Sequence, residues 1–206
     1  MNRSALDAAG AEAIARLSAA VAANDAPGVT REAESAIAGG VAAAAVYEAI
    51  LQSYLFVGFP RTIEAFFAAR ALLERHGGIP AAPEPPSPAE WTARGEDLCR
   101  RVYGRHYEKL VETMRGFSPD LAAWMILEGY GKTLSRPSLS PAEREYGVLA
   151  ILTVTRMWRQ LRSHAIGTVS VGGTRAGVRA AIAAARPWAG DDTVREALET
   201  TGLREE

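Results

Sequence analysis

Apolar residues recur at spacings of three and four along most of the chain, which is the period of an amphipathic α-helix. The first such segment covers residues 8–24, where Ile14, Leu17 and Val21 fall on one face. Thr30, with acidic residues on either side of the slot three positions later, predicts the start of a second helix through an imperfect capping box. Two further helices are expected in this first part of the chain, over residues 41–57 and 61–76.

The clearest helical signal of the second half begins at Ser140, a good N-cap. Pro141 suits the first helical position, and Glu143 completes a capping box. An apolar face follows, and then a polar patch that contains His164. No stretch of any length alternates with the period of a β-strand, so the predicted fold class is all-α. Other helices are expected over residues 90–104, 105–115 and 118–128, followed by an ordered loop over residues 129–141.

A proline-rich segment and an internal similarity suggest how the chain is divided. Prolines at positions 80, 83, 85, 86 and 88 favour extended backbone and predict a linker over residues 79–89. A shift of 132 positions aligns Leu17 with Leu149 and several glycines and apolar residues of the two halves, without a gap. We therefore predict two degenerate helical repeats, in residues 1–78 and 90–206.

Composition narrows the classes of function. The 206 residues are 48% hydrophobic, and their formal net charge is −1. Without a basic stripe, nucleic acid is not an expected partner. Cys99 is the single cysteine, so an internal disulfide and a Cys-x-x-Cys zinc or redox pair are excluded. Three scattered histidines form no metal-binding spacing, and no metal or cofactor is expected. These features predict a cytoplasmic location.

Membrane and targeting signals are not expected either. The opening residues lack the continuous apolar region of a signal peptide. Residues 39–60 are apolar for roughly the 20 residues of a bilayer span. Glu48 and Gln52 lie in the middle of that segment, where a carboxylate would cost several kcal/mol in a bilayer. A buried core helix is therefore expected, and no membrane contact.

The order of several motifs resembles the carboxymuconolactone decarboxylase family, whose all-helical fold is shared with the alkylhydroperoxidase AhpD proteins. In the first half, Glu48, Ile50, Gln52 and the segment FVGFP (Phe56–Pro60) are similar to the closing segment of the family. The resemblance covers residues 95 to about 182 of the second half. It is carried there by Gly95, Arg100, Arg101, Gly104, Tyr130, Gly131, Arg136, Pro137, Leu139, Arg144, His164 and Gly172.

The resemblance implies a cofactor-free lyase that decarboxylates a small lactone or another acid of aromatic catabolism. His164 would be the general acid or base, Arg144 would hold carboxylate, and Tyr130 would donate a hydrogen bond to a developing enolate. Arg136 would bind carboxylate through its guanidinium fork. The expected substrate-binding residues are Arg136, Gln160, Glu48 and Phe56.

Each of these residues also has a structural interpretation. His164 could cap a helix end, Tyr130 could be a core residue, and Arg136 could anchor its loop. Arg144 in a first helical turn suggests a specific partner, either an anion or a buried Glu. Glu48 could transfer protons or pair with an Arg.

Departures from the family pattern leave the activity open. Gln160 stands four residues before His164, where decarboxylases of the family usually have Glu, so less support for the His164 pKa is expected. The segment WRQLRSH lacks the AhpD thiols, which disfavours peroxidase activity. A catalytically silent protein that binds a small molecule or a partner is the alternative.

Neither predicted repeat is complete. Glu32 stands at the position equivalent to His164, and WAGDD stands in the second repeat where the first has FVGFP. We therefore hypothesise one composite site per chain, formed by His164 and residues 56–60. A homo-oligomer, a dimer or trimer of two-repeat chains, is expected, with a small organic acid as the ligand.

Overall fold

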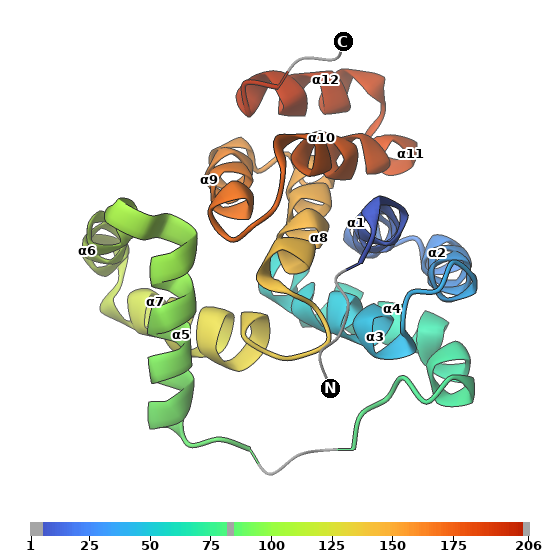
Figure 1. The fold of residues 1–206 in the computed structure, drawn as a ribbon, viewed down its shortest axis with the longest axis horizontal. Helices are drawn as coiled ribbons and strands as arrows, with labels where there is room; N and C mark the ends of the chain where they lie inside the picture. Colours follow the sequence, from blue (N-terminus) through green and yellow to red (C-terminus); the bar gives the residue numbers. More distant parts are fainter. Residues whose placement is uncertain (1–5, 82–84, 204–206) are drawn as a thin grey trace. The chain divides into compact units, whose positions relative to one another are not determined.

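A computed structural model describes residues 6–81 and 85–203, and within these ranges every regular element is a helix (Figure 1). The predicted all-α fold class is therefore confirmed. The helices pack into two units, residues 6–80 with 138–203 and residues 85–137, which are described separately. Pro83, one of the predicted linker prolines, lies outside the described residues.

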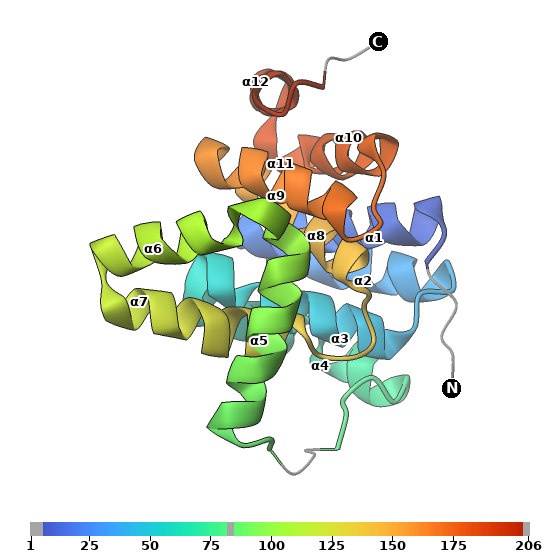
Figure 2. The ribbon, with the colours of Figure 1, turned by 60° about the vertical axis from the view of Figure 1, so that its left-hand side comes forward.

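The first unit contains nine of the described helices, four from the N-terminal part of the chain and five from the C-terminal part. In both views α8 lies between α1 and α9 (Figure 1, Figure 2). The helices are α1 (Ala8–Ala22), α2 (Ala26–Ala38), α3 (Ala43–Gln52), α4 (Tyr54–Arg75), α8 (Pro141–Val154), α9 (Trp158–Ser170), α10 (Arg175–Ala184), α11 (Arg186–Ala189) and α12 (Asp191–Thr200).

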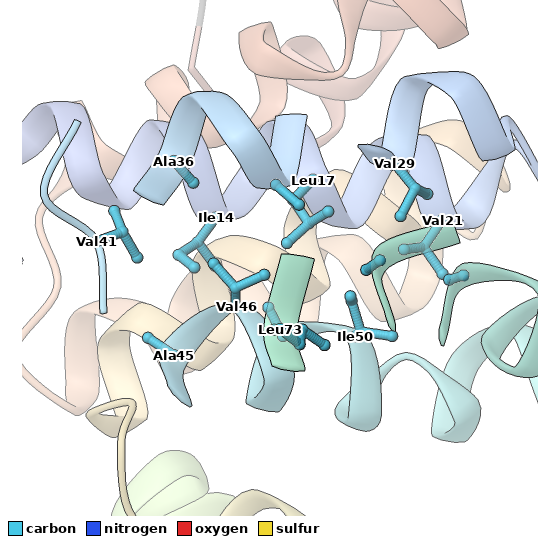
Figure 3. Packing of buried hydrophobic residues seen from close by; sticks show 14 of the residues in the cluster. Ile14, Leu17, Val21, Val29, Ala36, Val41, Ala45, Val46, Ile50 and Leu73 are labelled. Carbon is cyan, nitrogen blue, oxygen red and sulfur yellow. The ribbon is translucent and has the colours of Figure 1, made fainter. Parts of the chain in front are cut away.

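The apolar face predicted for the first helix is buried. Ile14, Leu17 and Val21 of α1 are at most 1% exposed, and Figure 3 shows them packed towards Val46 and Ile50 of α3. The opposite side of α1 contributes to a second cluster, which is formed with residues of α8, α10 and α12. Because α1 is covered on both sides, it is the central helix that joins the two ends of the chain.

The helix start predicted at Thr30 is wrong. Asp25, not Thr30, caps α2, and its side chain accepts a hydrogen bond from the Gly28 amide over 3.0 Å. Thr30 lies within the helix, where its hydroxyl donates to main-chain carbonyls. The break predicted at Gly58 is present as a kink inside α4, where φ is 77°, and the helix expected over residues 61–76 follows this kink. Only glycine adopts this backbone conformation readily.

The capping box predicted at Ser140 is confirmed. The Ser140 hydroxyl accepts from the Glu143 amide, while a Glu143 carboxylate oxygen accepts from the Ser140 amide over 2.6 Å. The other Glu143 oxygen accepts from the Leu6 amide over 2.6 Å. Glu143 therefore fixes the start of α8 and also ties it to the residue that precedes α1.

The second unit is also helical. A π-helix covers residues where the sequence predicts the end of a helix and an ordered loop, so the loop expected over residues 129–141 is wrong in its first part. Gly95 and Gly131 allow α5 and the π-helix to touch, since a Cβ at either position would lie within about 2 Å of a main-chain oxygen. The elements are α5 (Pro88–Tyr103), η1 (Gly104–His106), α6 (Tyr107–Phe117), α7 (Pro119–Trp124) and η2 (Met125–Leu134).

Helix boundaries in the first unit repeat with the same shift of 132 positions that aligns the sequence. The bounds of α2 coincide with those of α9, and the bounds of α3 with those of α10. Backbone conformations with positive φ also coincide, at Asn24 and Arg156 (56° and 57°), Gly40 and Gly172 (91° and 98°), and Gly58 and Gly190 (77° and 81°). The coincident bounds and conformations lie within residues 24–58 and 156–190, and the division into repeats 1–78 and 90–206 stays a prediction.

Among the described helices, none combines the length and the apolar character that a bilayer span requires. Glu48 and Gln52, which argued against a span in the sequence, are both buried in α3.

Candidate functional site

His164 lies in α9 and pairs with a carboxylate of the neighbouring helix α8. Its Nδ1 atom is 2.7 Å from Oε2 of Glu145, and the two side chains are only 10% and 5% exposed. Thr168, one turn further along α9, donates its hydroxyl to the His164 carbonyl over 2.7 Å. The imidazole of His164 therefore lies on a regular helix, with its ring against Glu145.

This pairing determines the proton chemistry of His164. Burial lowers the pKa of the imidazole, but the charge and the hydrogen bond of Glu145 outweigh burial, so the pKa is raised above its ordinary value. The expectation of less support for the His164 pKa is therefore wrong, because Glu145 provides the carboxylate that position 160 lacks. When Nδ1–H donates to Glu145, the other ring nitrogen, Nε2, is left to exchange a proton with a bound molecule.

Phe56 is the second group that the structure brings to His164. The two rings meet edge to face, with centroids 5.9 Å apart and an angle of 80° between their planes. Phe56 lies at the start of α4, two residues before the Gly58 kink. A ring from the first half of the chain therefore packs against the imidazole from the second half.

Arg144 and Glu48 form a buried ion pair. An Arg144 guanidinium nitrogen lies 2.9 Å from Oε2 of Glu48, and the side chains are 2% and 4% exposed. Gln52 accepts a further hydrogen bond from the guanidinium over 3.2 Å. This pairing favours the structural alternative for both residues, in which Arg144 meets a buried Glu and Glu48 meets an Arg.

The remaining predicted residues lie apart from this pairing or in the other unit. Gln160 is exposed on α9, one turn before His164. Tyr130 is 4% exposed within residues 85–137, and its hydroxyl donates to Tyr103 over 3.1 Å. Arg136 is partly buried in the same unit. The burial of Tyr130 fits its structural interpretation, in which it is a core residue.

Glu145 is the site residue that sequence reasoning missed. It follows Arg144 directly and reads as part of an ordinary charged first turn. A signal was nevertheless present, since Glu143, Arg144 and Glu145 form a run of three charges at the start of an otherwise apolar helix. All three are less than 5% exposed, and such burial requires a partner for each charge.

The position equivalent to His164 in the first half carries a different arrangement. Glu32 is 5% exposed and pairs with two nitrogens of the Arg16 guanidinium, at 2.8 and 3.2 Å. The Arg16 guanidinium lies 5.7 Å from the ring centre of Trp188, which occupies the position equivalent to Phe56. Trp188 in turn donates to Asp25 over 2.9 Å. An ion pair thus stands where the second half has a titratable imidazole.

Among residues 6–81 and 85–203, no group of three His, Cys, Asp or Glu side chains is arranged to hold a metal ion. The titratable imidazole of the site is therefore that of His164, paired with Glu145.

The fold and the site thus define an all-helical protein with a buried histidine–carboxylate pair on adjacent helices. Residues 119–201 match the sequence model of the carboxymuconolactone decarboxylase family, and both members of the pair fall in this range. The resemblance to that family, predicted from the sequence, is therefore found over these residues.

A curated relative is similar over a longer range. "Peroxisomal protein 2" from Schizosaccharomyces pombe (strain 972 / ATCC 24843) is 32% identical over 145 residues. The alignment covers 65% of this chain and 63% of that protein. The chain therefore spans less than two thirds of the length of this relative.

Proposed function

We propose that this chain is a cofactor-free lyase of the carboxymuconolactone decarboxylase type, which removes carbon dioxide from a small lactone or a related acid of aromatic catabolism. The observation that carries the proposal is the buried pair of His164 and Glu145, 2.7 Å apart, within the region that matches the family. A general acid of this kind is most effective when its pKa lies near the working pH.

The pair supplies the proton that decarboxylation requires. As the bond between the substrate carboxylate and its neighbouring carbon breaks, carbon dioxide leaves and the electron pair stays on the substrate as an enolate. Nε2–H of the His164 imidazolium then protonates the carbon, and the neutral imidazole recovers a proton from water. The carboxylate of Glu145, 2.7 Å from Nδ1, stabilises the imidazolium.

Phe56 gives the proposed site its composite character. Its ring, 5.9 Å from the imidazole, supports one site per chain, built from His164 of the second half and the turn 56–60 of the first. Gln160, exposed one turn before His164, remains a predicted substrate contact. Arg144 and Glu48 are instead proposed to act through their buried pairing.

The alternative is a catalytically silent protein that binds a small molecule or a partner. A solvent-facing His164 would favour it, but His164 is only 8% exposed. Convergence of Arg144 on His164 would favour the enzyme, whereas the guanidinium of Arg144 donates hydrogen bonds to Glu48 and Gln52. The pairing of His164 with Glu145 is therefore the observation that favours catalysis, and the contacts of Arg144 do not add to it.

Peroxide reduction as in AhpD is disfavoured. Cys99 is buried in α5, and the helix of His164 carries no thiol. A thiolate nucleophile is required for that chemistry. A peroxidase assay checks this directly, because activity that survives Cys99→Ser would make the thiol argument irrelevant.

Release of carbon dioxide from carboxymuconolactone tests the proposed function. Turnover by the native chain is expected, with a loss of about 100-fold or more in His164→Ala and in Glu145→Gln. His76→Ala is the matched control, because His76 is exposed and lies at the C-terminal end of α4. Absence of turnover in the native chain would overturn the decarboxylase assignment.

A further inference from the structure

Three consecutive charged residues are buried in the first turn of α8, and each has a different partner. Glu143 caps the helix, Arg144 pairs with Glu48, and Glu145 pairs with His164. Successive residues of an α-helix point about 100° apart, so the three side chains leave α8 in different directions. The position of α8 is therefore coupled directly to the position of the Glu145 carboxylate.

The Arg144–Glu48 pair is a poor source of stability for its own sake. Both side chains are at least 96% buried, and the loss of hydration on burial offsets most of the attraction between the charges. A buried ion pair is, however, demanding in geometry. Its best-attested role is to specify one arrangement of the helices over others.

Gln52 holds the main chain of α8 as well as the Arg144 side chain. Its Oε1 accepts from the guanidinium over 3.2 Å, and its Nε2 donates to the Arg144 carbonyl over 3.1 Å. That carbonyl belongs to the peptide group that joins Arg144 to Glu145. A side chain of α3 is therefore hydrogen-bonded to the main chain of α8 at the peptide next to Glu145.

Close packing leaves little room for α8 to move at this point. A Cβ at Gly147 would lie 2.9 Å from Nε2 of Gln52 and 2.7 Å from Oγ of Ser18. Such distances lie below normal contact distances, so glycine is what permits α8 to approach α1 and α3 this closely.

The same segment of the first half also reaches His164. Glu48, Gln52 and Phe56 are spaced at i, i+4 and i+8, and the backbone at Ser53 between the two helices stays close to helical, with φ −61° and ψ −25°. Residues at this spacing lie along one side of a helix. These three side chains therefore form a row that contacts α8 beside Glu145 at one end and the His164 ring at the other.

We propose that Glu48, Gln52 and Arg144 are positioning residues, which fix Glu145 against His164 and so make the first half of the chain responsible for the geometry of the pair. The inference rests on the proposed function for its catalytic meaning. The positioning itself is a property of the pair and is measurable without a substrate.

Gln52→Met tests the proposal in the full-length chain. Methionine is of similar size but cannot make either hydrogen bond to Arg144. In a variant that is folded by circular dichroism, the midpoint of the His164 titration, followed by NMR of the imidazole protons, is expected to move to lower pH. Glu145 is the charged group that raises the pKa of His164. When Glu145 is displaced, burial, which lowers that pKa, becomes the dominant influence on it. With carboxymuconolactone, kcat is expected to fall about 10- to 100-fold with little change in KM.

Glu48→Gln is the second variant, and it keeps the shape of the side chain while removing its charge. The same direction of change is expected, and this variant decides the matter if Gln52→Met does not fold. Glu74→Gln is the control, because Glu74 forms an exposed ion pair with Arg70 on α4. The control should leave both the titration and kcat unchanged.

The two proposals fail in different ways. An unchanged His164 titration in folded Gln52→Met and Glu48→Gln would overturn the positioning role. Absence of turnover in the native chain would overturn the proposed function, and the titration would still decide whether these residues position Glu145.

Discussion

Replacing Glu145 by Gln should reverse the sign of the contribution that His164 makes to the pH dependence of stability. In the native chain the pKa of His164 is raised, because Glu145 outweighs the lowering effect of burial. The folded state therefore holds this proton more tightly than the unfolded chain. The pair contributes fully to stability below the ordinary pKa of His, and this contribution is lost as the pH rises through the raised value.

In Glu145→Gln only the effect of burial remains, and it favours the neutral ring. Folding of the variant then expels the proton, so its stability should rise with pH over the same range. The amide oxygen of Gln can still accept from Nδ1–H of a neutral imidazole, so the cost at about pH 8.5 should be about 1 kcal/mol. At about pH 5 the ring has lost its buried counter-charge, and the cost should be about 3 kcal/mol or more.

Thermal unfolding at these two pH values is a suitable assay. For a chain of this size, about 3 kcal/mol corresponds to a decrease in Tm of about 6–12 °C, against about 2–4 °C for the smaller cost. Glu74→Gln is the control, since its side chain is 52% exposed and its solvent-screened pairing with Arg70 should leave Tm nearly unchanged at either pH. An equal loss of Tm in Glu145→Gln at both pH values would refute the electrostatic coupling to His164.

Three further outcomes are expected. Leu149→Ala removes a fully buried side chain and should destabilise the fold by about 2–5 kcal/mol, whereas Ile166→Ala, at a 60% exposed position, should change the free energy of unfolding by less than about 0.5 kcal/mol; urea denaturation measures both. Gly58→Ala and Gly190→Ala, with φ of 77° and 81°, should each cost about 1–3 kcal/mol, and markedly unequal costs would count against equivalent turns in the two halves. Light scattering after size-exclusion chromatography should give a dimer or trimer of the chain. A stable hexamer would contradict the hypothesis that each chain supplies a composite site within itself and so needs fewer subunits.

Features with a local cause were predictable from the sequence. The capping box at Ser140 and the apolar face of α1 follow from residues three or four positions apart, and both are confirmed. Local signals can also compete, as at the start of α2. There the Asp25 side chain accepts from the Gly28 amide, so the helix begins before Thr30 is reached, and Asp25 was not predicted as a cap.

Features that depend on packing between helices were not predictable. Glu145 lies 19 positions before His164, and their contact arises because α8 and α9 pack against each other. Residues 143–153 are buried on every side of α8, so no polar face distinguishes a functional carboxylate from its neighbours. The π-helical path of residues 125–134 likewise has no periodic signature that separates it from a helix followed by a loop.

The central place of α1 has a consequence for the way this chain is made. Helix α1 ends at Ala22, and its neighbour α8 ends at Val154, 132 residues later. At ribosomal rates of about 5–20 residues per second, roughly 7–26 seconds pass before that neighbour exists. During this interval the side of α1 that packs against α8 has no native partner. The nascent chain therefore exposes an apolar surface while these residues are being made, and this is the kind of surface that chaperones recognise.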